Sequence, residues 1–262
     1  MRQNPTTPFG IVHSLNNALV YLPLEQVDGH AEIVDVSATV TFTQTFWQAC
    51  STQTQRAKYV FPIPAHAAIC GFEMSTEDGR TVTAVAKETE TAKQEHEQAI
   101  QEGKMTGLVV MASGDVFTVS LGCLPSMQMI TTKLTYVMDL MEDDSADQVR
   151  LLLPVCIGSR YGQPSFEVVG AGMVPPERIT IAVDVFMSGE IRNITSPSHP
   201  TLAILDDGKV PIGSGRSPRR RAARYSSRDF LIDDFILCVK SEGLNAPRCF
   251  AEPIVSVVQF EL

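Results

Sequence analysis

Apolar and polar residues alternate along much of this chain, which is the pattern of half-buried β-strands. In residues 32–43, EIVDVSATVTFT, apolar positions from Val34 to Phe42 alternate with polar positions from Asp35 to Thr43. The same alternation runs through residues 129–140, MITTKLTYVMDL, and through residues 179–187, ITIAVDVFM. Each segment is therefore predicted to be one strand, with an apolar face in the core and a polar face in solvent.

One segment has helical rather than strand periodicity. Residues 87–104, KETETAKQEHEQAIQEGK, place Ala92, His96, Ala99 and Ile100 at positions i, i+4, i+7 and i+8. That spacing produces a narrow apolar stripe on a helix. Gly103 can end the helix in the left-handed conformation. A single amphipathic helix is predicted over about residues 87–102, packed on or beside a sheet.

Two stretches mark where strands stop and turn. In residues 59–72, YVFPIPAHAAICGF, the two prolines cannot donate to a strand ladder, so pairing must end there. Alternation resumes after them, and Cys70 is expected on the apolar face with Phe72 and Met74. The dipeptide Asp78-Gly79 then supplies the backbone angles of a tight hairpin. We read the proline stretch as a structural corner.

Composition narrows the function classes. The chain has 262 residues, of which 44% are hydrophobic, and a net charge of -9. This charge disfavours nucleic acid and acidic membranes as partners of the whole chain. The polar start of the chain shows no apolar signal segment, and the cysteines form no CxxC motif. We expect buried free thiols and a cytoplasmic location, with the nucleus as the alternative.

An arginine-rich loop is predicted over residues 213–228. Residues 216–228 contain six arginines and no acidic residue, so the loop contrasts with the acidic remainder of the chain. Three interpretations stay open: a solvated insertion, an anion-binding or nuclear-targeting patch that could also hold nucleic acid, and a phosphorylation switch. The candidate anion or targeting residues are Arg216, Arg219, Arg220, Arg221, Arg224 and Arg228. The candidate phosphorylation sites are Ser217, Ser226 and Ser227.

Two motifs resemble sites of chemistry. Residues 35–39, DVSAT, resemble a DxSxS motif that binds Mg²⁺, but we expect them on the solvated face of a strand rather than in a loop. His66 and Cys70 could pair as base and nucleophile, although an apolar surrounding would raise the pKa of the thiol. Neither motif has the surroundings that its chemistry requires, so no catalytic, metal-binding or cofactor-binding residue is predicted. A thiol-dependent enzyme using Cys70 or Cys123 is kept as a minor alternative.

Several segments in order resemble the VIT (vault protein inter-alpha-trypsin) domain family. YVFPIPAHAAICGFEM at residues 59–74 is similar to the family's Y-x-F-P-L-P-x-x-A-A-V-x-G-F segment. The helix and its terminal Gly-Lys follow, then GDVFTVSLGCLP at residues 114–125 and KLTYVMDL at residues 133–140. The upstream strand ATVTFTQTF also fits. The resemblance covers about residues 10–141 and depends on several motifs at consistent spacing.

The chain departs from the family pattern at two positions. His96 stands where the family helix usually has Tyr, and Cys123 stands where the family has Asn in G-N-x-P. The first departure removes aromatic packing against the sheet. The second puts in doubt any hydrogen bond that the Asn side chain makes at that turn. Neither is expected to change the fold.

The resemblance implies a mainly β protein of two antiparallel sandwich-like units, the first carrying the helix. Residues 1–150 would be the VIT domain, and residues 151–262 a hybrid-type linker domain that precedes a von Willebrand factor A-type domain in the family. That A-type domain is absent here, so the chain is either naturally short or part of a longer protein. The resemblance implies a non-catalytic interaction or scaffold module without a cofactor, paired with an A-type domain in cis or in trans.

Overall fold

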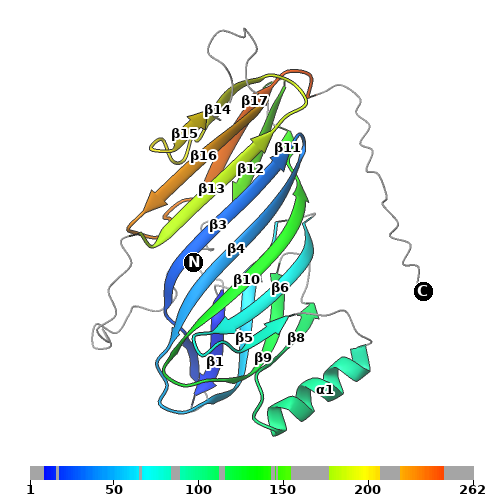
Figure 1. Cartoon of the computed structure of the whole chain (residues 1–262), viewed down its shortest axis with the longest axis vertical. Coiled ribbons are helices and arrows are strands. Elements are labelled where there is room, and N and C mark those ends of the chain that lie inside the picture. The colour runs from blue at the N-terminus through cyan, green and yellow to red at the C-terminus, as the bar shows by residue number, and fades with distance from the viewer. Residues whose placement is uncertain are drawn as a thin grey trace, which may run out of the picture.

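The strands of this computed structural model lie in three sheets, of which the largest extends along most of the molecule (Figure 1). This sheet has eight strands, in the order β15-β16-β13-β3-β4-β10-β6-β7. The structure describes residues 9–15, 18–64, 67–83, 89–111, 116–142, 145, 147–154, 177–206 and 219–244. The strands of the large sheet are β3 (Leu24–Val34), β4 (Ser37–Gln48), β6 (Ala68–Thr76), β7 (Thr81–Thr83), β10 (Gln128–Asp139), β13 (Ile179–Phe186), β15 (Ala203–Asp206) and β16 (Arg220–Ser227).

The two smaller sheets cover different parts of the large one (Figure 1). The five-stranded sheet has the order β2-β1-β5-β9-β8, and the four-stranded sheet has the order β11-β12-β17-β14. The strands of the first are β1 (Gly10–Leu15), β2 (Ala18–Tyr21), β5 (Thr54–Pro62), β8 (Thr106–Met111) and β9 (Val116–Leu124). Those of the second are β11 (Met141–Glu142), β12 (Gln148–Leu153), β14 (Ile191–Thr195) and β17 (Phe235–Ser241).

Aromatic side chains join the large sheet to each small sheet. The ring centroids of Phe42 and Phe61 are 5.5 Å apart, which links β4 to β5. Those of Tyr225 and Phe235 are 6.0 Å apart and link β16 to β17. Offset aromatic contacts at such distances add specific packing to the burial of apolar surface. The molecule therefore consists of two sandwiches that share one long sheet, which confirms the predicted mainly β class.

The seam between the two sandwiches is a parallel strand pair. β3 and β13 pair from Val27↔Ile179 to Val34↔Phe186, whereas the other neighbouring strands of this sheet are antiparallel. β3 comes early in the chain and β13 late, so one sheet draws strands from both sides of residue 150. The division into a VIT domain of residues 1–150 and a linker domain of residues 151–262 stays a prediction.

The predicted helix is confirmed as α1 (Thr89–Gln101), which begins two residues later than expected. His96 is buried, and its two ring nitrogens lie 3.2 Å from the hydroxyl oxygens of Thr106 and Ser120. On the exposed side, the Arg56 guanidinium donates two hydrogen bonds to the Glu97 carboxylate, at 2.9 and 2.6 Å. The histidine thus replaces the missing aromatic packing with polar contacts to two strands. Across the described ranges, no helix is long and apolar enough to cross a membrane.

The strands predicted at residues 129–140 and 179–187 are confirmed, as β10 and β13 with buried alternate positions. The hairpin at Asp78-Gly79 is also confirmed, because β6 and β7 flank it and Gly79 has a φ of 85°. The single strand predicted over residues 32–43 is wrong. β3 ends at Val34 and β4 begins at Ser37, so a hairpin turn interrupts the alternation.

The expected position of Cys70 is wrong too. The register of β6 against β10 pairs Thr135 with Gly71 and Tyr136 with Ile69, so Cys70 is the extra residue of a β-bulge. Its side chain is exposed, while Phe72 and Met74 are buried as predicted. The bulge moves Cys70 off the apolar face, and alternation alone does not reveal it.

Candidate functional site

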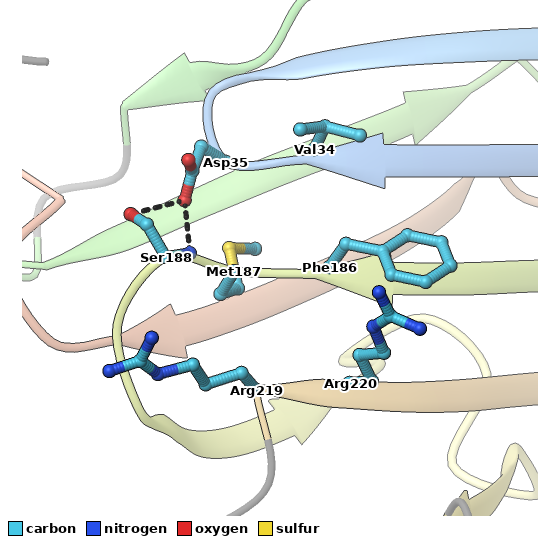
Figure 2. A pocket seen from close by; sticks show the side chains of 7 residues that line it. All are labelled: Val34, Asp35, Phe186, Met187, Ser188, Arg219 and Arg220. Carbon is cyan, nitrogen blue, oxygen red and sulfur yellow. Dashed lines mark hydrogen bonds between the residues drawn. The ribbon is translucent and has the colours of Figure 1, made fainter. Parts of the chain in front are cut away.

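A pocket of about 300 Å³ opens at one end of the β3–β13 seam. Three segments meet there: the β3–β4 turn, the end of β13 and the start of β16 (Figure 2). The lining residues are Val34, Asp35, Phe186, Met187, Ser188, Arg219 and Arg220. The segments are far apart in sequence, and strand pairing brings them together: β3 pairs with β13 in parallel, and β13 pairs with β16 in antiparallel orientation.

Asp35 forms one wall and is fixed by its neighbours. It sits in the β3–β4 turn with a φ of 53°, a left-handed conformation that Asp tolerates better than most residues. Its carboxylate accepts hydrogen bonds from the backbone N–H of Ser188 at 2.8 Å and from the Ser188 hydroxyl at 3.0 Å. Its own N–H donates to the carbonyl of Phe186 at 3.0 Å. Asp35 therefore ties the turn to the end of β13.

This environment differs from the one expected for the DVSAT segment. Asp35 is buried, with 3% of its surface exposed, and it occupies a turn rather than a solvated strand face. Thr39 does lie on β4, four residues further along, and is exposed. Among the described residues, no group of three or more His, Cys, Asp or Glu side chains is placed to hold a metal ion. The carboxylate of Asp35 acts as a hydrogen-bond acceptor for Ser188.

The opposite wall carries two arginines, Arg219 and Arg220 (Figure 2). The backbone of Arg219 accepts a hydrogen bond from the Met187 N–H at 2.8 Å, which fixes the start of β16 against the end of β13. The Arg220 guanidinium lies 5.1 Å from the ring centroid of Phe186, within the range of a cation–π contact. Both arginines are exposed, so their N–H donors are accessible to a ligand in the pocket.

The prediction of an arginine-rich loop over residues 213–228 is wrong for its second part, because β16 occupies residues 220–227, while residues 213–218 lie outside the described residues. Residues 220–227 form a strand between β13 and β15. The sequence RRAARYSS alternates, since Arg220, Ala222 and Arg224 share one face and Ala223 is fully buried on the other. Small alanines allow this strand to lie inside the sheet despite its arginines. The anion-binding or targeting role of these residues stays a prediction.

The other candidate residues are distributed along this strand and beyond it. Arg221 is half-buried within β16, and Arg228 is exposed after its end. Ser226 donates a hydrogen bond to Glu177 at 2.9 Å, and Ser227 accepts one from the Asp229 N–H at 3.0 Å. Arg216 and Ser217 lie outside the described residues. Of the six candidate arginines, Arg219 and Arg220 are those that line the pocket.

Arg224 belongs to a separate charged cluster on the solvent face of the sheet. It donates to Asp184 at 3.1 Å, and the His30 Nε2 lies 2.8 Å from the other oxygen of the same carboxylate. Burial alone would raise the pKa of Asp184, but the hydrogen bonds from His30 and Arg224 outweigh it and lower that pKa. The cluster holds β3, β13 and β16 together across the seam. Its arginine is paired with a carboxylate, whereas the Arg220 guanidinium at the pocket lies over the Phe186 ring.

The prediction of buried thiols holds for some of the cysteines and not for Cys70, which is exposed. Cys123 and Cys238 are buried as expected, and burial raises the pKa of the Cys123 thiol. His66 and Cys156 lie outside the described residues. A cysteine–histidine contact that the sequence did not reveal joins the Cys50 sulfur to the His13 Nε2 at 3.9 Å. The two residues are 37 positions apart and share no motif, so no local signal could have found them.

Solved structures align with this chain at low sequence identity and low TM-score. A zinc metallopeptidase of the M1 type from Deinococcus radiodurans, a mutant with a bound peptide substrate, aligns with a TM-score of 0.37 and 10% identity. The alignment covers 83% of this chain and 43% of the peptidase. Another structure of the peptidase aligns with a TM-score of 0.39 and 7% identity, over the same shares of both chains.

Comparison by sequence identifies a family. Human protein mono-ADP-ribosyltransferase PARP4 is 37% identical over 119 residues, and the mouse protein of that name is 35% identical over the same length. Each match covers 45% of this chain but only 7% and 6% of the relatives, so less than half of this chain corresponds to a small part of each relative. The sequence profile of the vault protein inter-alpha-trypsin domain matches residues 24–136, from the start of β3 into β10. The chain therefore contains a VIT domain within residues 24–136.

Proposed function

We propose that this chain is a non-catalytic protein-interaction module whose partner is a von Willebrand factor A-type domain, in cis or in trans. The observation that carries the proposal is the VIT domain of residues 24–136, because that family suggests protein interaction. The A-type partner comes from the family resemblance, in which such a domain follows the module.

The surface offers features that suit an interaction role. β15 is an edge strand of the large sheet, and its residues Ile204 and Leu205 are 38% and 48% exposed. Exposed apolar side chains on an edge strand suit contact with another chain. The pocket at Arg219 and Arg220 adds a charged recess to the same part of the large sheet.

Binding of the two purified proteins tests the proposal. The full chain is mixed with a recombinant A-type domain taken from a protein in which it follows a VIT domain. An A-type domain from a protein without a VIT domain is the matched control. We expect the first pair to form a complex by sedimentation velocity and the control pair to stay separate. Separate sedimentation of both pairs would contradict the proposed partner.

Two alternatives have weaker support. A nuclear-targeting segment would need an accessible backbone as well as accessible basic side chains, whereas Arg220, Arg221 and Arg224 lie in a strand that is paired on both sides. A thiol-dependent enzyme would need an activated cysteine. Cys123 is buried with a raised pKa, which opposes formation of the nucleophilic thiolate. The Cys70 sulfur donates to its neighbouring Ala68 carbonyl at 3.5 Å.

A further inference from the structure

We propose that the pocket between Asp35 and Arg219–Arg220 binds a single anionic group, a carboxylate or a phosphate, on a side chain of a partner polypeptide. This inference rests on the proposed interaction function and names the chemistry that the partner would present at this site. The charge of the lining residues, their packing and the volume of the pocket each restrict the kind of ligand that can bind.

Charge selects an anion. The lining contains two guanidinium groups and one carboxylate, so it carries an excess of one positive charge in a chain whose net charge is -9. The carboxylate of Asp35 is occupied by the two hydrogen bonds from Ser188. The guanidiniums are exposed and present planar sets of donors that match carboxylate and phosphate oxygens. An incoming anion would meet donors that are free to bind it on the arginine side of the pocket.

The arginine wall is positioned before any ligand arrives. Arg220 rests on the ring of Phe186, and the backbone of Arg219 is held by Met187. Holding a charged group in its binding position reduces the conformational entropy lost on binding. The contact with Phe186 places the Arg220 guanidinium, and the hydrogen bond from Met187 places the backbone from which the Arg219 side chain extends.

Size and polarity point to one side chain rather than a cofactor. A volume of about 300 Å³ is at the lower limit for small-molecule sites. Val34, Phe186 and Met187 supply apolar surface beside the arginines, and Met187 is 4% exposed. The methylene stem of a glutamate, or the β-carbon of a phosphoserine, would contact this apolar surface while its anionic head reaches the guanidiniums.

Nuclear magnetic resonance on the full chain with ¹³C-methyl-labelled methionine provides the test, since Met187 lies in the pocket. A Met187→Leu variant assigns the signal. The probes are N-acetyl-glutamic acid amide and N-acetyl-phosphoserine amide, with N-acetyl-glutamine amide as the neutral control, all at constant ionic strength. Arg219→Gln and Arg220→Gln remove one guanidinium each. Arg228→Gln, at an exposed arginine outside the pocket lining, is the matched control.

We expect a saturable shift of the Met187 signal with an anionic probe and none with the neutral probe. The dissociation constant should rise at least tenfold in Arg219→Gln and stay unchanged in Arg228→Gln. Arg219→Gln keeps the Arg220–Phe186 contact, so a folding defect in Arg220→Gln leaves the test intact. A response to the glutamic acid probe alone assigns a carboxylate, and a response to the phosphoserine probe assigns a phosphate. Equal responses to charged and neutral probes, or unchanged binding in Arg219→Gln, would overturn the inference.

The complex with the A-type domain separates this inference from the proposed function. If Arg219→Gln loses the anionic probe but keeps the A-type domain, the pocket binds anions and the two domains meet at another surface. The anion site then stands, but the A-type domain is not the partner that supplies the anion. If the wild-type chain binds the probe but no A-type domain, the anion site stands and the proposed partner is wrong.

Discussion

A methyl group on Gly122 would lie 2.6 Å from Cγ1 of Ile100 and 2.7 Å from Cγ2 of Thr106. Gly122 is on β9 and Ile100 is on α1, so the missing side chain creates the space in which the helix rests on the sheet. Gly122→Ala should therefore force the helix outward and reduce the free energy of unfolding by roughly 1–3 kcal/mol, as overpacking does elsewhere. Urea denaturation of the two proteins measures the loss.

A neighbouring glycine supplies the control for that change. At Gly107, on β8, an added methyl would meet its nearest side-chain atoms at 3.4 and 3.5 Å, which is ordinary contact. Gly107→Ala is expected to be clearly milder. Amide hydrogen exchange should also rise along α1 in Gly122→Ala and not in Gly107→Ala. Equal destabilisation by the two substitutions would show that the helix does not depend on the space at Gly122.

The buried histidine of α1 should make the stability of the chain depend on pH. Burial lowers the pKa of His96 below its ordinary value of 6.5, and the nearby charges of Glu97 and Arg56 act in opposite directions on it. The unfolded chain therefore binds a proton at His96 before the folded chain does. The stabilisation is complete above pH 6.5 and is lost as the pH falls toward the folded-state pKa.

Denaturation midpoints between pH 7.5 and pH 5 measure this effect against His96→Gln. Glutamine can still bond the hydroxyls of Thr106 and Ser120 but does not titrate in this range. The variant should lose less stability than the wild type as the medium is acidified. Since burial also lowers the pKa of His199, some pH dependence remains in the variant, and the difference between the proteins is the informative quantity. Identical pH profiles would mean that His96 makes no contribution.

Much of the fold follows from local pattern. The alternation in β10 and β13, the stripe of α1 and the Asp-Gly turn each predicted an element that the structure contains. The apolar–polar pattern gave wrong predictions at positions where the backbone turns or gains an extra residue, because the alternation of buried and exposed side chains shifts there. The turn at Asp35 has no glycine, and the bulge at Cys70 adds one residue to a strand that otherwise alternates. Both errors come from backbone geometry that a run of side chains does not encode.

The pocket could not be predicted from the sequence because it depends on long-range strand pairing. Arg219 and Arg220 were recognised as candidate anion ligands, but the other pocket residues Asp35, Phe186 and Ser188 were not. Asp35 reaches the pocket because β3 pairs with β13 in parallel, whereas Phe186 and Ser188 lie beside the arginines because β13 pairs with β16. Both are long-range contacts that no sequence motif indicates. Tertiary pairing also turned the expected arginine loop into a strand, because Ala223 and Tyr225 pack toward the core there.

Thiol labelling should separate the cysteines by exposure. Under native conditions Cys70 is expected to react first, Cys50 more slowly, and Cys123 and Cys238 only when the protein unfolds. The raised pKa of Cys123 adds to its steric protection, because the thiolate is the reacting form. Peptide mapping after timed alkylation at neutral pH resolves each site. Rapid labelling of Cys123 in the folded protein would support the thiol-enzyme alternative and contradict this order.

The departure at Cys123 concerns the backbone more than a hydrogen bond. Cys123 has a φ of 55°, in the left-handed region where Asn, the residue of the G-N-x-P pattern, is well tolerated. A β-branched residue tolerates this conformation poorly, so Cys123→Val should destabilise the fold by about 1 kcal/mol more than Cys238→Val. Cys238 is the matched control because it is also buried on a strand, without a positive φ. Equal losses in urea denaturation would show that the conformation at Cys123 carries no strain for side chains of this shape.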